Sequence, residues 1–119
     1  MNMLNLSSLP KTWLIDLDGT IFPHNGYLKG IIEKPLRGVK DFFESLSTND
    51  FIIILTSRSS IYRNITERNL HLSGIRWNLL LMDMPKGERI LINDTKPSGL
   101  ITAYALQVER DRGLSGIRI

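Results

Sequence analysis

The run FIIIL at residues 51–55 constrains the fold more than any other segment of this sequence. Its residues are all apolar and the three isoleucines are β-branched, so no polar side chain is left to face water. Such a strand is typical of the middle of a parallel sheet whose two faces are both covered. The run therefore predicts an α/β fold in which residues 51–55 form a buried central strand.

The segments on either side of this run alternate between helical and strand patterns. Apolar residues at helical spacing predict helices at about residues 39–46 and 60–72, and Gly74 follows the second as a C-cap glycine would. Further strand patterns occur at residues 12–16 (TWLID), 77–82, 89–93 (RILIN) and 103–108. This alternation predicts a Rossmann-like three-layer sandwich around a mainly parallel sheet of about five strands.

Length and composition fit one globular domain. The 119 residues are 42% hydrophobic and 23% charged, as in ordinary soluble proteins. We expect residues 1–10 to form an N-terminal leader and residues 11–119 a single domain. The leader lacks the pattern of a signal peptide, and no apolar run is long enough to span a bilayer, so a cytoplasmic protein without a membrane partner is expected.

The absence of cysteine limits the kinds of catalytic and metal-binding sites that this chain can form. It excludes disulfides, thiolate nucleophiles and zinc sites with cysteine ligands, and two histidines are too few for a histidine-rich metal site. A metal would have to bind oxygen ligands, which suits Mg²⁺. The net charge of +3 is compatible with an anionic substrate but is only weak support for a nucleic-acid partner, which we do not expect.

Polar residues follow each predicted strand, at the sheet edge where ligands bind in open parallel sheets. The residues at these strand ends are Asp16 and Asp18, then Thr56, Ser57 and Arg58, then Lys86, and finally Asp94. Two carboxylates so close together attract a cation, and Mg²⁺ would suit them. Gly19 permits a sharp turn after them. Taken alone, however, this segment is equally typical of an acidic turn at a strand end.

Four of these segments together resemble the motifs of the haloacid dehalogenase (HAD) superfamily. DLDGTI at residues 16–21 resembles motif one, and LTSR at residues 55–58 resembles motif two. Lys86 resembles the motif-three lysine, and IND at residues 92–94 resembles the acidic motif four. The resemblance spans about residues 12–108 and implies a minimal phosphatase-type member. The intervals between the motifs are too short to hold a cap domain.

The resemblance also implies a role for each matching residue. Asp16 would attack the phosphorus, form an aspartyl-phosphate and bind Mg²⁺. Asp18 would act as general acid and base and bind the metal through its carbonyl, and Asp94 would complete the metal site. Thr56 would bind a phosphoryl oxygen and Lys86 would neutralise its charge. The other residues expected to contact the substrate are Gly19, Thr20, Ser57 and Arg58.

Two features depart from the family pattern. Asn93 stands beside Asp94 where a second acid is usual, which removes one charge from the expected metal site. Lys86 lies close before Asp94 with no helix between them, so Arg89 and Lys96 remain alternatives for the lysine role.

The expected activity is therefore that of a Mg²⁺-dependent phosphomonoester hydrolase. A sugar phosphate or a similar metabolite is the favoured substrate, with a homo-oligomer as one way to cover the open site. Two alternatives stay open: a phosphatase acting on a nucleic-acid end or a phosphoprotein, and a non-catalytic Mg²⁺-binding regulatory module of the same fold.

Overall fold

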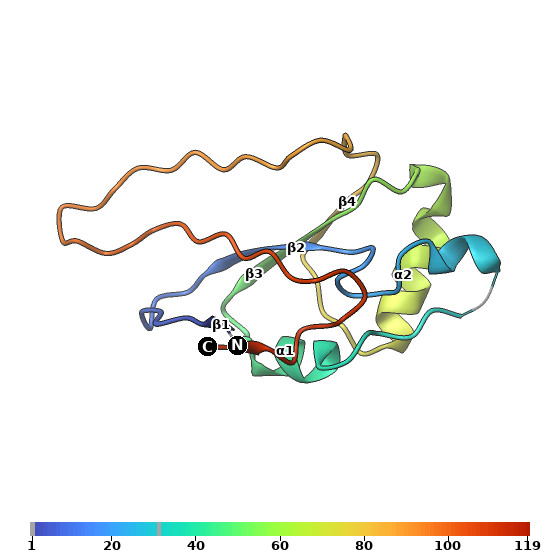
Figure 1. Ribbon diagram of the computed structural model, residues 1–119, viewed down its shortest axis with the longest axis horizontal. Helices are drawn as coiled ribbons and strands as arrows, with labels where there is room; N and C mark the ends of the chain where they lie inside the picture. Colours follow the sequence, from blue (N-terminus) through green and yellow to red (C-terminus); the bar gives the residue numbers. More distant parts are fainter. Residues whose placement is uncertain (1, 31) are drawn as a thin grey trace.

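A parallel three-stranded sheet forms the centre of the molecule (Figure 1). The structure is a computed structural model that describes residues 2–30 and 32–119. The strands are β2 (Thr12–Asp16), β3 (Phe51–Leu55) and β4 (Leu79–Leu81), hydrogen-bonded in that order. Helix α1 (Val39–Ser45) lies between β2 and β3 in the chain, and the 3-10 turn η2 (Ser60–Tyr62) and helix α2 (Arg63–Leu72) lie between β3 and β4. The structure thus confirms an α/β fold with a parallel sheet.

The central strand is β3, as its composition predicts. Its register places Ile53 beside Leu14 of β2 and beside Leu79 of β4. Ile52 and Ile54 point to the other face, where they are fully buried in the hydrophobic core. Alternate residues of a strand point to opposite faces, so one face of this sheet carries the core.

Both helices contribute to that core. Phe42 of α1 meets the ring of Trp13 edge to face, with 5.6 Å between the ring centroids. From α2, Leu70 is fully buried and Arg63 donates a hydrogen bond to the carbonyl of Leu80 at 3.0 Å. Helix α1 thus buries an apolar side made of Val39, Phe42 and Phe43. Helix α2 buries Leu70 together with the polar Thr66 and Asn69, while Ile65 and Leu72 are exposed.

The opposite face of the sheet is only partly covered. Leu14, Leu79 and Leu81 are exposed there, and Ile53 and Leu55 are half-buried. The prediction that the 51–55 strand is covered on both faces is therefore wrong. No helix within residues 2–30 and 32–119 packs on this face, so a third layer is not seen.

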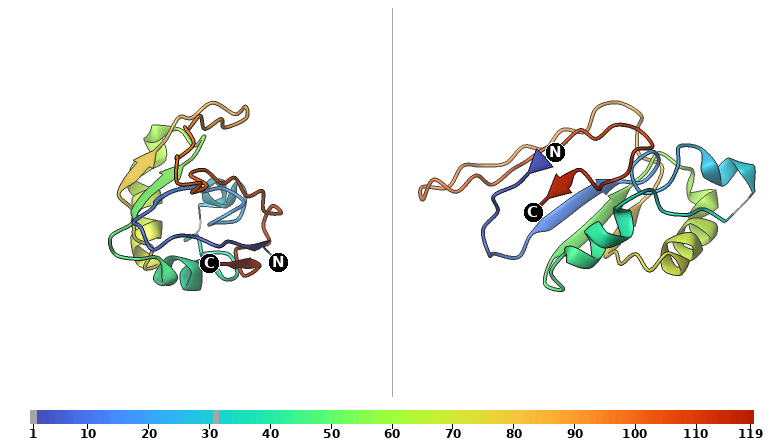
Figure 2. Two further views of the ribbon diagram at one scale, coloured as in Figure 1. Left: turned by 90° about the vertical axis from the view of Figure 1, so that its left-hand side faces the viewer. Right: turned by 60° about the horizontal axis from the view of Figure 1, so that its bottom comes forward.

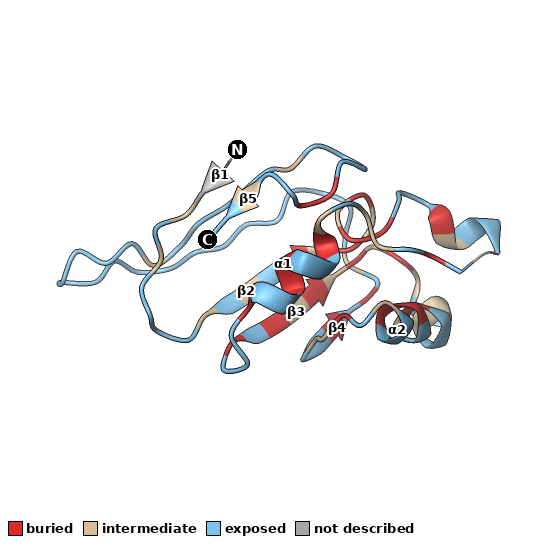
Figure 3. Cartoon of the chain, turned by 90° about the horizontal axis from the view of Figure 1, so that it is seen from below, coloured by how far each residue is buried: buried red, intermediate tan, exposed pale blue. Residues whose placement is uncertain are grey.

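Residues 85–108 form an exposed arm that projects from the body (Figure 3). The strands expected at residues 89–93 and 103–108 are not formed, so within the described residues the main sheet has three strands rather than about five. Ile90 and Ile92 are 82% and 91% exposed, because nothing described packs against them. The two limbs of the arm bond to each other, since Asn93 donates to the Thr102 carbonyl and Thr102 donates to the Asp94 carbonyl.

The two ends of the chain meet away from the main sheet. Strand β1 (Asn2–Met3), within the predicted leader, pairs in parallel with β5 (Ile117–Arg118), as Figure 2 shows. The described residues include no helix of the length and apolarity that crossing a bilayer requires.

Asp50 joins the starts of β2 and β3. Its carboxylate accepts hydrogen bonds from the Lys11 backbone and from the Trp13 indole, each at 2.9 Å. Burial of Asp50 opposes its ionisation, but these hydrogen bonds outweigh that effect and lower its pKa. A carboxyl group whose pKa is lower in the folded than in the unfolded protein stabilises the fold above its unfolded pKa.

We predict that Asp50→Asn lowers the free energy of unfolding by about 1–3 kcal/mol at pH 7, because it removes charged hydrogen bonds in a buried position. The difference from the unmodified protein should shrink as the pH falls from about 4 through the lower folded-state pKa of Asp50, below which the carboxyl is protonated in both states. Urea unfolding followed by tryptophan fluorescence measures both effects. Glu44→Gln, at an exposed position of α1, is the control; an equal loss in both variants would contradict the assigned role.

Candidate active site

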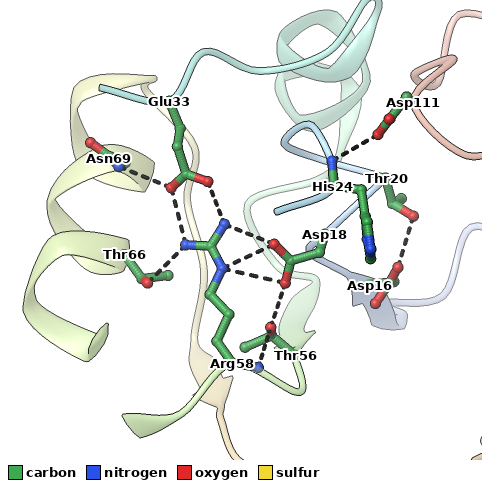
Figure 4. A network of polar contacts seen from close by, with 10 residues as sticks. All are labelled: Asp16, Asp18, Thr20, His24, Glu33, Thr56, Arg58, Thr66, Asn69 and Asp111. Atoms are coloured by element: carbon green, nitrogen blue, oxygen red, sulfur yellow. Dashed lines mark hydrogen bonds and ion pairs between the residues drawn. The ribbon is translucent and has the colours of Figure 1, made fainter. Parts of the chain in front are cut away.

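The carboxyl ends of β2 and β3 bring the first two predicted motifs together. Asp16 is the last residue of β2, and the next residue, Leu17, still donates its N–H to the Leu55 carbonyl of β3 at 3.1 Å. This places Asp18 opposite Thr56, whose hydroxyl donates to the Asp18 carboxylate at 2.8 Å (Figure 4). The expected nucleophile, acid/base and phosphate-binding threonine thus lie at one rim of the sheet.

The turn after β2 is held by its own backbone. The Leu17 carbonyl accepts hydrogen bonds from the N–H groups of Ile21 and Phe22, and Gly19 donates to the Phe22 carbonyl at 2.7 Å. Gly19 has a φ of 82°, in the region that glycine adopts without strain. Thr20 then reaches back, and its hydroxyl donates to Asp16 Oδ2 at 3.0 Å.

A segment near the C-terminus packs on this turn. Asp111 donates its N–H to the Gly19 carbonyl and accepts the His24 N–H on its side chain, each at 2.8 Å. The side chain of Arg110 lies over Gly19, where an added Cβ would come within 3.1 Å of it. The sequence does not predict this contact. Arg110 and Asp111 lie in an ordinary charged stretch, and nothing in their spacing links them to the turn at Gly19.

Asp16 is paired with an arginine from the base of the arm. Arg89 Nη1 lies 2.8 Å from Asp16 Oδ1, and both side chains are about 40% exposed. Lys86, the residue expected here, is exposed and makes no ion pair with a described carboxylate. Arg89, the alternative for the lysine role, is the residue that reaches the expected nucleophile.

Arg58 is buried at the centre of the site, and each of its three nitrogens faces a carboxylate. Nε donates to Asp18 at 3.0 Å from Oδ1, and Nη2 forms an ion pair with the same oxygen at 2.9 Å. Nη1 and Nη2 donate to the two carboxylate oxygens of Glu33, and Nη1 also donates to the Thr66 hydroxyl. Figure 4 shows the guanidinium between the two acids, with Asn69 donating to Glu33 from α2. Arg58 was expected to contact substrate, and in this arrangement its nitrogens are paired with protein acids instead.

Electrostatics and an aromatic ring reinforce this pairing. Burial of Arg58 opposes its charge, but its hydrogen bonds to Glu33 and Asp18 outweigh this effect and raise the pKa of the guanidinium. The Tyr27 ring stacks on Arg58, 4.1 Å from its central carbon. Burial, followed by the negative charge of Asp18, raises the pKa of Tyr27, so its hydroxyl stays neutral. The guanidinium is therefore fixed in charge and in position.

The remaining predicted residues lie further from this cluster. Ser57 is half-buried and its hydroxyl is 3.5 Å from the Pro85 carbonyl. Asp94 lies in the arm, where its carbonyl accepts a hydrogen bond from Thr102. In Figure 1 the arm extends away from the carboxyl ends of the strands, where the site lies. The expected third metal ligand is thus not brought to Asp16 and Asp18 in this arrangement.

The donor set at the strand end still fits Mg²⁺ in its chemistry. Asp16 and Asp18 offer carboxylate oxygens two residues apart, and Mg²⁺ is commonly held by one or two carboxylates together with water and a substrate phosphate. Within the described residues no group of three or more acidic or histidine side chains gathers to hold a metal. Binding at Asp16 would have to compete with Arg89 for the same oxygen.

Glu33 is the main residue that sequence reasoning missed. It lies in the long loop after β2, a feature that is usually functional, but nothing in its neighbouring residues marks it as buried. Asn69, which donates to Glu33, and Thr66, which accepts from Arg58, appear in the sequence only as polar residues on an otherwise ordinary helix. The signal is a set of contacts between distant segments, which a single sequence does not display.

Comparison with known proteins gives one informative likeness. No protein-family model matches this sequence, and no curated protein matches it. A chain in a solved structure titled "Structure of the Pnkp1/Rnl/Hen1 RNA repair complex" is similar, with 28% sequence identity and a TM-score of 0.54. The match covers 72% of this chain and 30% of that one. This protein therefore corresponds to less than a third of the length of that neighbour.

Arg89→Gln should tighten Mg²⁺ binding, because it frees Asp16 from a competing cation. An exposed pair of this kind contributes about 0.2–1 kcal/mol, so the expected gain is about 1.5- to 5-fold. Titration with MgCl₂ alone, followed by NMR shifts of the residue 16–20 amides, measures it.

Lys86→Gln is the matched control, since it removes the same charge nearby without freeing Asp16. Equal Mg²⁺ affinity in the two variants would show that the Arg89 contact does not compete with the metal.

Proposed function

We propose that this protein is a magnesium-dependent phosphomonoester hydrolase, a minimal and capless member of the HAD superfamily. The observation that carries the proposal is the pairing of Asp18 with Thr56, 2.8 Å apart, beside Asp16 at the end of β2. This combination offers a nucleophile, a proton-transfer group and a phosphate-binding hydroxyl within one small area.

Asp16 is the proposed nucleophile. Thr20 holds one of its oxygens, which orients the carboxylate, and the other oxygen pairs with Arg89 on the exposed side of the site. Arg89 must release that oxygen before Asp16 attacks. That oxygen forms a bond to phosphorus as the ester P–O bond breaks, giving an aspartyl-phosphate and an alcohol.

Asp18 is the proposed acid and base. It protonates the departing ester oxygen in the first step. In the second step it takes a proton from a water molecule that attacks phosphorus, which releases inorganic phosphate and restores Asp16. To do so it must turn from Arg58 toward the substrate.

The charge of the transferring group needs neutralisation. Arg89 supports this role by its contact with Asp16, and the Thr56 hydroxyl supplies a neutral donor to a phosphoryl oxygen. Asp16 and Asp18 would hold Mg²⁺, which supplies further charge neutralisation between two anions that otherwise repel each other.

We favour a phosphorylated sugar or a similar small metabolite as the substrate, because the net charge of +3 offers little attraction to a polyanion. The side chain of the proposed nucleophile is 39% exposed, so such a ligand can reach it. The arm carries apolar side chains that a second copy of the chain could cover, in keeping with the expected homo-oligomer.

A terminal phosphate on RNA is the second candidate substrate. The similarity to a chain from an RNA repair complex favours it, although that likeness covers only part of the neighbour. The mild net charge of +3 provides little non-specific attraction to RNA, so binding would depend on contacts close to the phosphate.

Asp16→Asn and Asp18→Asn should each lower kcat/KM by about a thousandfold or more, because each removes a group that takes part in bond making. Hydrolysis of 4-nitrophenyl phosphate with Mg²⁺, and after treatment with EDTA, measures the effect. Asp41→Asn, exposed on α1, is the control and should retain activity.

Full activity in Asp16→Asn would refute the assigned nucleophile, and full activity after EDTA would refute the metal requirement. A parallel assay on sugar phosphates and on RNA carrying a 3′- or 5′-phosphate separates the two substrate classes by their relative kcat/KM.

A further inference from the structure

Glu33 is an unusual acid for a loop position. Its side chain is only 1% exposed, and burial of a carboxylate is costly unless charged partners and hydrogen bonds compensate it. Those partners are two N–H groups of Arg58 and the Asn69 amide at 2.9 Å. The catalytic scheme assigns Glu33 no role, although it is among the most deeply buried charged groups near the site.

The two acids on Arg58 differ in how firmly they are held. Both acids face Arg58 with both oxygens, but Glu33 is 1% exposed and is backed by Asn69 of α2. Asp18 is 17% exposed, and among the described residues only the Thr56 hydroxyl holds it from its other side. Thr66 adds a further contact on the Glu33 side of the guanidinium. Asp18 is therefore the partner that can leave, and Glu33 is the partner that stays.

We propose that Glu33 is a positioning residue that keeps Arg58 in place while Asp18 turns from it to the substrate. This inference rests on the proposed phosphohydrolase function. When Asp18 turns away, Glu33 still neutralises the buried guanidinium, so Arg58 is not left without a counter-charge. The edge that Asp18 vacates, Nε–H and one Nη2–H, then presents a two-pronged donor to a phosphoryl oxygen.

Loss of the Glu33 charge should impair this exchange. With glutamine at position 33, Asp18 becomes the sole counter-charge of a buried arginine and is held in the resting pair. Substrate can still reach the exposed Asp16, so the loss should fall mainly on kcat and much less on KM.

The first test compares Glu33→Gln with Glu67→Gln, in which the same change is made at a half-exposed acid on α2 that pairs only with Arg63. On 4-nitrophenyl phosphate with Mg²⁺, Glu33→Gln should lower kcat about tenfold or more with KM changed by less than about threefold, while Glu67→Gln behaves as the unmodified protein. Equal kinetics in the two variants, or a loss confined to KM, would overturn the proposal.

The second test does not depend on turnover. The NMR resonance of the Arg58 Nε–H should be protected from solvent exchange, and it should shift when Mg²⁺ and inorganic phosphate are added, because phosphate replaces Asp18 as its partner. In Glu33→Gln this shift should be absent. An unchanged resonance in the unmodified protein would overturn the exchange, whereas a protein that shows the shift but hydrolyses no phosphomonoester would refute only the proposed function.

A milder variant tests the proposal in case Glu33→Gln does not fold. Asn69→Leu keeps all the charges and removes one hydrogen bond that holds Glu33. It should lower kcat in the same direction but less than Glu33→Gln, with the thermal midpoint showing that the fold is intact; unaltered kcat in a folded Asn69→Leu variant would count against the proposal.

Discussion

The ion pairs of Arg58 with Asp18 and Glu33 connect the segments that form the candidate active site. A buried guanidinium is tolerated only when its charge is balanced and its donors are paired, and here the partners come from the turn after β2, the following loop and α2. Removing Glu33 would leave Asp18 as the only counter-charge of Arg58 among the described residues. The position of Asp18 is therefore fixed jointly with that of the Glu33 loop, and the site behaves as one unit although its residues are far apart in the sequence.

The burial of Arg58 also gives the two carboxylates at the end of β2 different surroundings. Asp18 faces inward, to the buried and rigid Arg58, whereas Asp16 faces outward, to Arg89 on an exposed arm. An exposed ion pair is weak and exchanges easily with a metal or a phosphate, while a buried pair exchanges only if its charge stays balanced. This difference suits a nucleophile that must be accessible and an acid/base group that must be oriented.

The spacing of apolar residues along the chain correctly predicted two strands and two helices. TWLID and FIIIL form the strands at the expected bounds, and the first amphipathic segment forms α1 with its apolar residues in the core. The second segment also forms a helix, but Ile65 and Leu72 are exposed and the polar Thr66 and Asn69 are buried. The turn from Asp16 to Thr20 and its proximity to Thr56 also followed from strand order alone. The pattern failed for RILIN, since an apolar strand needs a neighbouring edge and the chain leaves the sheet after β4. The pairing of Arg58 with two acids could not be predicted, because Asp18 and Glu33 lie in segments that no spacing rule connects to it.

The central claim, that Asp16 is the nucleophile of a phosphoryl-transfer site, is tested most directly by trapping the intermediate. The protein is mixed with Mg²⁺ and a phosphomonoester that it turns over, quenched, reduced with borohydride and analysed by peptide mass spectrometry. An acyl phosphate on Asp16 is reduced to homoserine, so the account predicts homoserine at position 16 and unmodified Asp18. Phosphate release with Asp16 unmodified under these conditions, or the mark on another residue, would contradict it.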